Sequence, residues 1–65
     1  MVDTSALKGI IVSRDKTQED VAIHLGIAPK TFYSKMKKKV FGSDEIEKMI
    51  DYLDIDDPVA IFFAK

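Results

Sequence analysis

The stretch from residue 17 to residue 39, TQEDVAIHLGIAPKTFYSKMKKK, places the strongest constraint on how this chain can fold. Thr17 is a good N-cap, and Asp20 follows three residues later in a near capping-box arrangement. The apolar residues that come next fall on one helical face: Val21, Ala22 and Leu25. A short amphipathic helix is therefore predicted to begin at Thr17.

A glycine break follows this helix. Gly26 can adopt a left-handed conformation and end the helix, and Pro29 suits the first turn of the next one. Two short helices joined by a glycine turn are typical of a helix-turn-helix, so residues 17–38 are predicted to form that motif.

The second helix of the motif has two different sides. One is an apolar stripe that can face a core: Ala28, Phe32 and Met36. The opposite side carries groups that can reach bases or phosphates: Lys30, Tyr33, Ser34 and Lys37. No acid occurs between Val21 and Ser43, whereas five lysines do. A solvated basic helix is the simpler interpretation, but the capped helix and glycine turn before it favour DNA binding.

Composition limits the alternatives. The 65 residues suffice for one domain, and the absence of cysteine excludes disulfides and thiolate metal sites. The net charge of −1 averages two opposite regions, because residues 44–57 contain seven acids against Lys48 alone. A chain with one basic helix and an acidic far side can still bind a polyanion in one orientation.

Three further helices are predicted around the motif. Asp3 or Thr4 can cap a first helix that runs to about Ser13, with its apolar residues in the core: Leu7, Ile10 and Ile11. After Phe41, which is expected in the core, and Gly42, which is expected to turn the chain, Ser43 caps a fourth helix to about Leu53. Its predicted buried stripe is Ile46, Met49, Ile50 and Leu53.

A short final helix is predicted within residues 57–64, capped by Asp56 or Asp57 and begun by Pro58. Glycine and proline are expected only at junctions, and no strand-like alternation is present. The fold class is therefore all-α, a compact bundle of about five short helices with a central helix-turn-helix, in a single domain covering residues 1–65.

Residues 59–64 are all apolar. Either one or two phenylalanines close the core and the rest lie half exposed, or the segment contacts another subunit. Ile23 is also apolar, although it lies off the face of Val21 and Leu25, where a polar residue is expected. The candidate residues for a protein interface are therefore Ile23, Ile61, Phe62 and Phe63.

Residues 18–27, QEDVAIHLGI, resemble the first half of the helix-turn-helix in the phage Cro and repressor (XRE-like) family. The glutamine, the apolar–alanine pair, the glycine and the apolar residue after it match in spacing. The resemblance extends over nearly the whole chain, with one helix before the motif and two after it. The ending, Phe-Phe-Ala after Asp-Pro, is similar to small Cro-like regulators of Gram-positive phages. A lambda-repressor-like DNA-binding domain is the fold that this resemblance implies.

The resemblance also implies roles for individual residues. Those at base edges in the major groove would be Pro29, Lys30, Thr31, Tyr33 and Ser34, on a recognition helix of about residues 29–38. Those at DNA phosphates would be Thr17, Gln18, Lys37, Lys38 and Lys39. The chain departs from the family pattern at three positions: Ala28 in place of a hydroxyl cap, Pro29 in place of a polar base reader, and Lys35 where an apolar residue is usual.

Catalysis is not expected. His24 is the only histidine and is predicted to face solvent without a role, and no cysteine or phosphate-binding glycine loop is present. No metal and no cofactor are therefore expected. Without a targeting signal or a membrane-spanning stretch, a cytoplasmic protein is expected.

The expected function is that of a phage or prophage transcriptional regulator of Cro type, such as a repressor, that binds double-stranded operator DNA. It would act as a homodimer, formed in solution or only on DNA. The alternative is a protein-interaction module, similar to an antirepressor, that binds another regulator through apolar and acidic surfaces. The two differ in salt response, because phosphate contacts weaken steeply with salt and an apolar interface does not.

Overall fold

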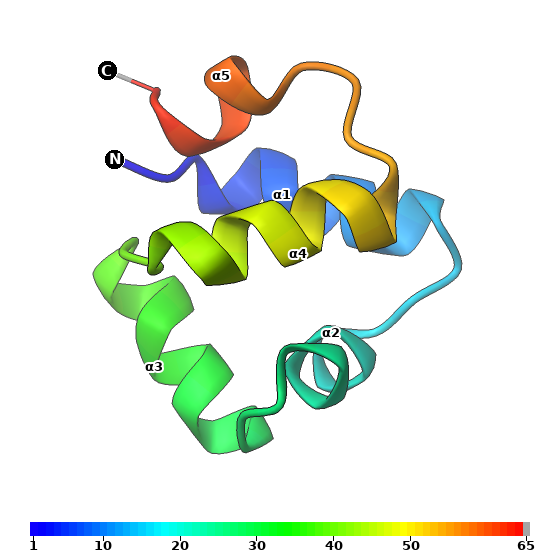
Figure 1. Ribbon diagram of the computed structural model, residues 1–65, viewed down its shortest axis with the longest axis vertical. Helices are drawn as coiled ribbons and strands as arrows, with labels where there is room; N and C mark the ends of the chain where they lie inside the picture. The colour runs from blue at the N-terminus through cyan, green and yellow to red at the C-terminus, as the bar shows by residue number, and fades with distance from the viewer. Residues whose placement is uncertain (65) are drawn as a thin grey trace.

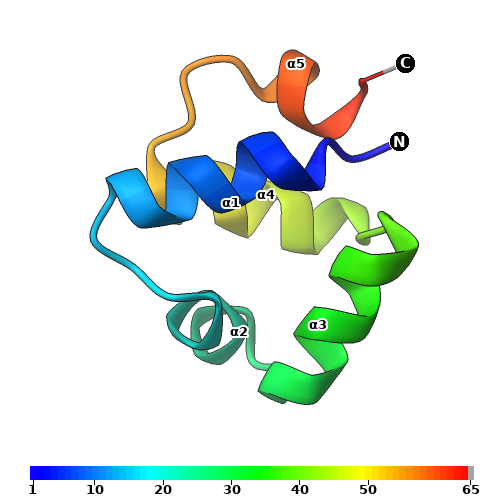
Figure 2. The same ribbon diagram turned by 180° about the vertical axis from the view of Figure 1, so that it is seen from behind.

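A computed structural model describes residues 1–64, which contain five α-helices and no strand. The helices are α1 (Thr4–Ser13), α2 (Gln18–Leu25), α3 (Pro29–Lys38), α4 (Ser43–Leu53) and α5 (Pro58–Phe62). In Figures 1 and 2, α1 and α4 cover each other at the centre, α2 and α3 lie on one side of them, and α5 lies on the other. The predicted all-α class and the number of helices are confirmed for these residues.

Three helices begin at the acidic or hydroxyl caps that the sequence predicts. The Asp3 carboxylate accepts from the Ala6 N–H at 3.1 Å and starts α1. At α2, Thr17 and Asp20 form a full capping box: each side chain accepts the other's backbone N–H, at 3.0 and 2.8 Å. At α5, the Asp57 carboxylate accepts from the Ala60 N–H at 3.3 Å, as Asp3 does at α1.

The predicted cap of the fourth helix is wrong by one residue. Ser43 is the first helical residue of α4, and Gly42, in extended conformation (φ −71°, ψ 157°), is its N-cap. The physical reason is Glu45, whose carboxylate accepts the Gly42 N–H at 2.8 Å and fixes where the helix begins. Gly42 therefore lies at the junction between α3 and α4, as predicted, but as the N-cap of α4.

Of the other two glycines, Gly26 lies at a helix end, as predicted, and Gly9 does not. Gly26 ends α2 in the left-handed conformation, with φ at 76°, as predicted. Gly9 lies inside α1, so the expectation that glycines occupy only junctions is wrong. At the end of α3 the left-handed residue is Lys39, with φ at 60°, although it carries a side chain.

A single apolar core lies between the helices. Its fully enclosed side chains come from four of them: Leu7, Ile11, Val21, Phe32, Met49 and Leu53. Phe41 is buried as predicted, with its ring 5.5 Å from that of Phe32. Three residues predicted to be in the core are only half buried and pack against its edge: Ile10, Ile46 and Ile50. Ala28, predicted to continue the apolar stripe of α3, is exposed.

Long-range hydrogen bonds bring distant parts of the chain together. Arg14, after α1, donates through Nε to the Leu53 carbonyl at 2.7 Å and through Nη2 to the Asp54 carbonyl at 2.9 Å. It thereby caps the C-terminal end of α4 with a cation. With 11 residues, α4 is the longest described helix, and none of those in residues 1–64 could serve as a membrane span.

Candidate nucleic-acid interface

The candidate interface is built on α2, α3 and the three residues between them. The Gly26 N–H closes the last turn of α2, and the Ile27 N–H bonds to the Ala22 carbonyl at 3.1 Å. Pro29 then begins α3, where its fixed φ and missing N–H are compatible with a first turn. In Figure 1, α2 is seen almost end-on while α3 lies in the plane of view, so the two packed helices cross steeply.

The side chains of α3 are divided between the core and the surface. Phe32 and Met36 are buried, as predicted. Four of the five predicted base-edge residues are exposed on the remaining circumference: Lys30, Thr31, Tyr33 and Ser34. The fifth, Pro29, is half buried. The exposed groups combine an ammonium group, two hydroxyls and a phenol, all of which can donate hydrogen bonds to bases or phosphates.

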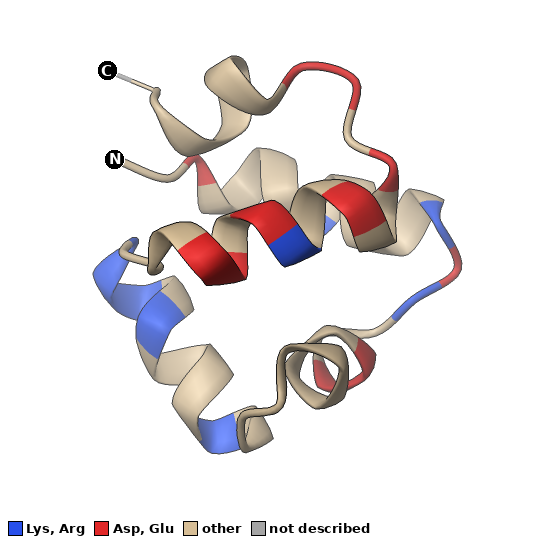
Figure 3. Ribbon diagram, viewed as in Figure 1, with Lys and Arg blue, Asp and Glu red and all other residues tan. Residues whose placement is uncertain are grey.

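Three of the predicted phosphate contacts lie at the end of α3. Lys37, Lys38 and Lys39 are all exposed. Figure 3 shows the basic residues along α3 and the acidic residues along α4 and the loop that follows it. The charge separation expected from the sequence is therefore present on the folded molecule.

Lys35 does not belong to this free basic surface. Its Nζ lies 2.7 and 2.8 Å from the two carboxylate oxygens of Glu45, which is 8% exposed. The same carboxylate accepts the Gly42 N–H, so Glu45 links the end of α3 to the start of α4. The charge of Lys35 is thus neutralised within the chain.

The remaining predicted phosphate contacts lie at the start of α2 and are less favourable than expected. Thr17 is exposed and Gln18 half buried, but Asp20 and Glu19 occupy the first turn. The Thr17 backbone N–H, and then its hydroxyl, lower the pKa of the Asp20 carboxyl from its usual 3.8, with a smaller contribution from Lys16. Asp20 is therefore negative at neutral pH and offsets the positive end of the helix dipole.

His24 has a partner that the sequence did not reveal. Its ring stacks on that of Tyr52, with centroids 3.9 Å apart and planes 11° apart, and Lys16 lies 5.2 Å from the Tyr52 centroid. The stack joins α2 to α4 outside the core. His24 is exposed, as predicted, but it contributes to the packing of the two helices.

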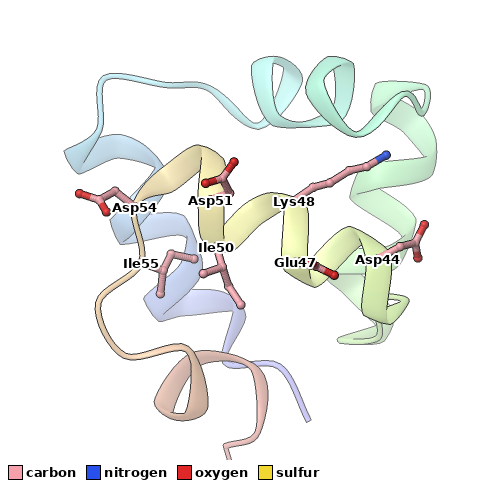
Figure 4. Close-up of a pocket in the computed structure, with 7 residues that line it drawn as sticks. All are labelled: Asp44, Glu47, Lys48, Ile50, Asp51, Asp54 and Ile55. Carbon is pink, nitrogen blue, oxygen red and sulfur yellow. The ribbon is translucent and has the colours of Figure 1, made fainter.

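A hollow of about 690 Å³ lies on α4 and has the wrong charge for a nucleic acid. Its four carboxylates are spread along the helix and its end in Figure 4: Asp44, Glu47, Asp51 and Asp54. No group of three or more potential ligand residues within the described part of the chain is placed to hold a metal ion.

The candidate protein-interface residues are separated by the fold. Ile23 and Phe63 are exposed, at 65% and 64% of their surface. Ile61 and Phe62 are buried in the core of this chain. Two of the four candidate interface residues therefore contribute mainly to the core, and the final segment largely closes it.

Comparison with known proteins adds no relative to this description: no protein-family model and no curated protein matches the chain.

Proposed function

We propose that this chain is a sequence-specific, double-stranded-DNA-binding transcriptional regulator of Cro type. In this proposal α2 and α3 are the two helices of a helix-turn-helix, and α3 is the recognition helix that enters the major groove. The proposal rests first on the two-sided character of α3.

The single observation that carries the proposal is that α3 buries Phe32 and Met36 while it exposes a continuous polar and basic surface. A helix held to the core by two large side chains is rigidly presented, which suits base recognition. The exposed residues at its start, Lys30 and Thr31, and in its middle, Tyr33 and Ser34, would contact base edges. Spacings of three and four residues keep Lys30, Tyr33 and Ser34 on one face of the helix, and Thr31 lies three residues before Ser34 beside them.

Affinity would come mainly from the lysines after the base-reading positions. Lys37, Lys38 and Lys39 are exposed next to one another at the end of α3. Each phosphate that such a lysine neutralises makes the dependence of log K on log salt steeper by about 0.9. Thr17 and Gln18 would add hydrogen bonds to the backbone rather than charge, because Glu19 and Asp20 lie beside them.

The alternative, a module that acts by binding another regulator, has less support. Of the four residues considered for it, Ile23 and Phe63 alone are exposed, and they belong to α2 and to the end of α5. These two elements lie on opposite sides of α1 and α4 (Figures 1 and 2), so the two residues do not form one surface. Failure of the DNA-binding test below would favour this alternative.

The test is a binding titration on a random duplex and on duplexes from the DNA that flanks the gene for this chain, over a series of salt concentrations. The expected result is tighter binding to one flanking duplex, by ~10³-fold or more over random DNA, with a steep salt dependence. Absence of binding to both at low salt would contradict the proposal and would lead to pull-down experiments for a protein partner.

Lys30 is the residue expected to carry the first base contact, to guanine. Lys30→Ala is expected to weaken specific binding by about 1–3 kcal/mol and to relax the preference at one operator position. Lys8→Ala, which removes an exposed lysine from α1, is the matched control and is expected to leave that preference unchanged. Equal losses on specific and random DNA would show that Lys30 contacts only phosphate.

A further inference from the structure

A second hollow, of about 240 Å³, lies where the first residues of the chain, the end of α3 and α5 meet. The Val2 N–H bonds to the Lys39 carbonyl at 3.3 Å, and the Asp3 N–H bonds to the Ile61 carbonyl at 2.7 Å. Figures 1 and 2 show the start of the chain between the end of α3 and α5. Backbone hydrogen bonds therefore join the three segments that form the walls of the hollow.

The hollow has an apolar floor and an exposed apolar rim. Phe41 and Phe62 are buried within its lining. Met1, Val40 and Phe63 are exposed over 75%, 66% and 64% of their surface, and all three line it. Such a cluster of exposed apolar side chains marks a contact surface more often than scattered exposure does. Pockets for small-molecule ligands usually measure about 300–1,000 Å³, so this smaller hollow suits one large apolar side chain.

Positive charge adjoins the apolar rim. Among the described lining residues, Lys39 alone is charged. Lys37 and Lys38 precede it and are exposed, and Figure 3 shows basic residues gathered at this end of α3. Within residues 1–64, the ion pair at this end of α3 joins Lys35 to Glu45 and leaves the other three lysines unpaired. A ligand that enters the hollow therefore meets cations at its edge, and an acidic ligand is attracted to them.

We propose that this hollow is the docking site for an acidic segment of a partner protein, which inserts one large apolar side chain. That side chain packs against Phe41, Phe62 and the exposed rim, while neighbouring carboxylates pair with the lysines. Charge complementarity selects this occupant over a second copy of the chain, whose own lysines would be repelled. A short segment also suits the small rim, because a stable interface between folded proteins buries about 800 Å² per partner.

Docking at this hollow has a consequence for the proposed DNA surface. Lys37, Lys38 and Lys39 are the proposed phosphate contacts, and carboxylates that pair with them compete with DNA for the same cations. The partner therefore acts as an inhibitor of DNA binding. This consequence rests on the proposed function, whereas docking of the acidic segment does not.

The test is a titration of the full chain, by fluorescence anisotropy, into a labelled synthetic peptide with one phenylalanine flanked on both sides by aspartates and glutamates. The expected result is saturable binding that weakens with added salt. Two control peptides, one with serine for the phenylalanine and one with neutral amides for the acids, are each expected to bind about tenfold more weakly or worse. Absence of binding at about 1 mM, or equal binding of the serine peptide, would overturn the proposal.

Substitutions in the chain locate the site. Phe63→Gln changes an exposed rim residue and is expected to weaken peptide binding by about fivefold or more. Lys39→Gln is expected to weaken it and to make its salt dependence shallower. Val12→Gln and Lys8→Gln are the matched controls, since both residues are exposed on α1 and neither lines the hollow. Equal peptide binding by Phe63→Gln and Val12→Gln would overturn the proposal.

A competition experiment on one random duplex separates docking from the proposed function. The peptide is expected to displace DNA from the wild type and to do so less readily from Phe63→Gln, which keeps every lysine. Peptide binding by a chain that does not bind DNA would contradict the proposed function and leave the docking site in place. DNA binding without peptide binding would overturn the docking site alone. Binding to vesicles of anionic phospholipid but not to the peptide would also overturn it, in favour of a lipid surface.

Discussion

At the scale of single residues, Asp20 is the side chain on which the start of α2 depends. Hydrogen bonds from Thr17 favour its ionised form and lower its pKa from 3.8. A carboxyl whose pKa is lowered by folding stabilises the folded state above the unfolded pKa. This stabilisation is lost as the pH falls from 3.8 through the lowered folded-state value.

The prediction is that Asp20 titrates below 3.8 in the folded protein, measured by carboxyl chemical shifts in an NMR pH titration. Thr17→Val removes the hydroxyl but keeps the backbone N–H that contributes most, so the pKa is expected to rise only part of the way toward 3.8. Asp20→Asn, as control, is expected to remove this part of the acid dependence of unfolding. A folded-state pKa at or above 3.8 would contradict the role of the capping box.

The residues that could be predicted from the sequence are those whose partners are close along the chain. The caps Asp3, Thr17 and Asp57 were predicted because each bonds to the backbone three residues away. The Lys35–Glu45 ion pair and the Arg14 bond to the Leu53 carbonyl join residues 10 and 39 positions apart. No local pattern specifies such pairs, because they depend on how the helices pack.

At the scale of elements, α3 ends at Lys38 as predicted, but the backbone conformations of the residues after it were not predicted. Gly42 was expected to turn the chain, yet it is extended, and Lys39 takes the left-handed conformation. The run of lysines gives no sign of a helix end, since lysine is a good helix former. Asp54 ends α4 in the same left-handed conformation.

Lys39→Gly is expected to raise the free energy of unfolding by about 1 kcal/mol, because glycine adopts a left-handed conformation without steric cost. The same change removes a cation from the proposed DNA surface, so DNA binding is expected to weaken and its salt dependence to become shallower by about 0.9. Chemical denaturation and a binding titration in a salt series measure the two effects.

Asp54→Gly is the matched control for Lys39→Gly. It relieves the same backbone conformation at the end of α4, away from the lysines of α3. Its expected result is a similar gain in stability without weaker DNA binding. If Lys39→Gly binds DNA as well as wild type does, Lys39 is not a phosphate contact.

At the scale of the whole molecule, the arrangement of charge matters more than the net charge for binding to a polyanion. The chain has a net charge of −1, but its lysines gather on α3 and its acids on α4 and the following loop (Figure 3). This separation could be predicted because each charge cluster is contiguous in sequence. The burial of Ile61 and Phe62 could not be, because a uniformly apolar segment gives no periodicity to show which side faces the core.

A side chain of α4, Glu45, connects α3 to the start of α4 in addition to the shared core. Glu45 bonds Lys35 on α3 and the Gly42 N–H at the start of α4. Glu45→Gln keeps a hydrogen-bonding side chain and removes the ion pair, so a loss of stability of about 1–2 kcal/mol is expected. The Lys35 side chain is 34% exposed, and its hydration limits the loss.

The effect of Glu45→Gln on DNA binding separates a positioning role from a simple charge effect. Removal of an acid should by charge alone tighten binding to a polyanion, the more so because Lys35 is released. If Glu45 positions α3, sequence-specific binding is instead expected to weaken while binding to random DNA holds or tightens. Glu47→Gln, the control with the same charge change at an exposed position on α4, is expected to show only the charge effect. Tighter specific binding by both variants would contradict the positioning role and leave Glu45 as a contributor to stability alone.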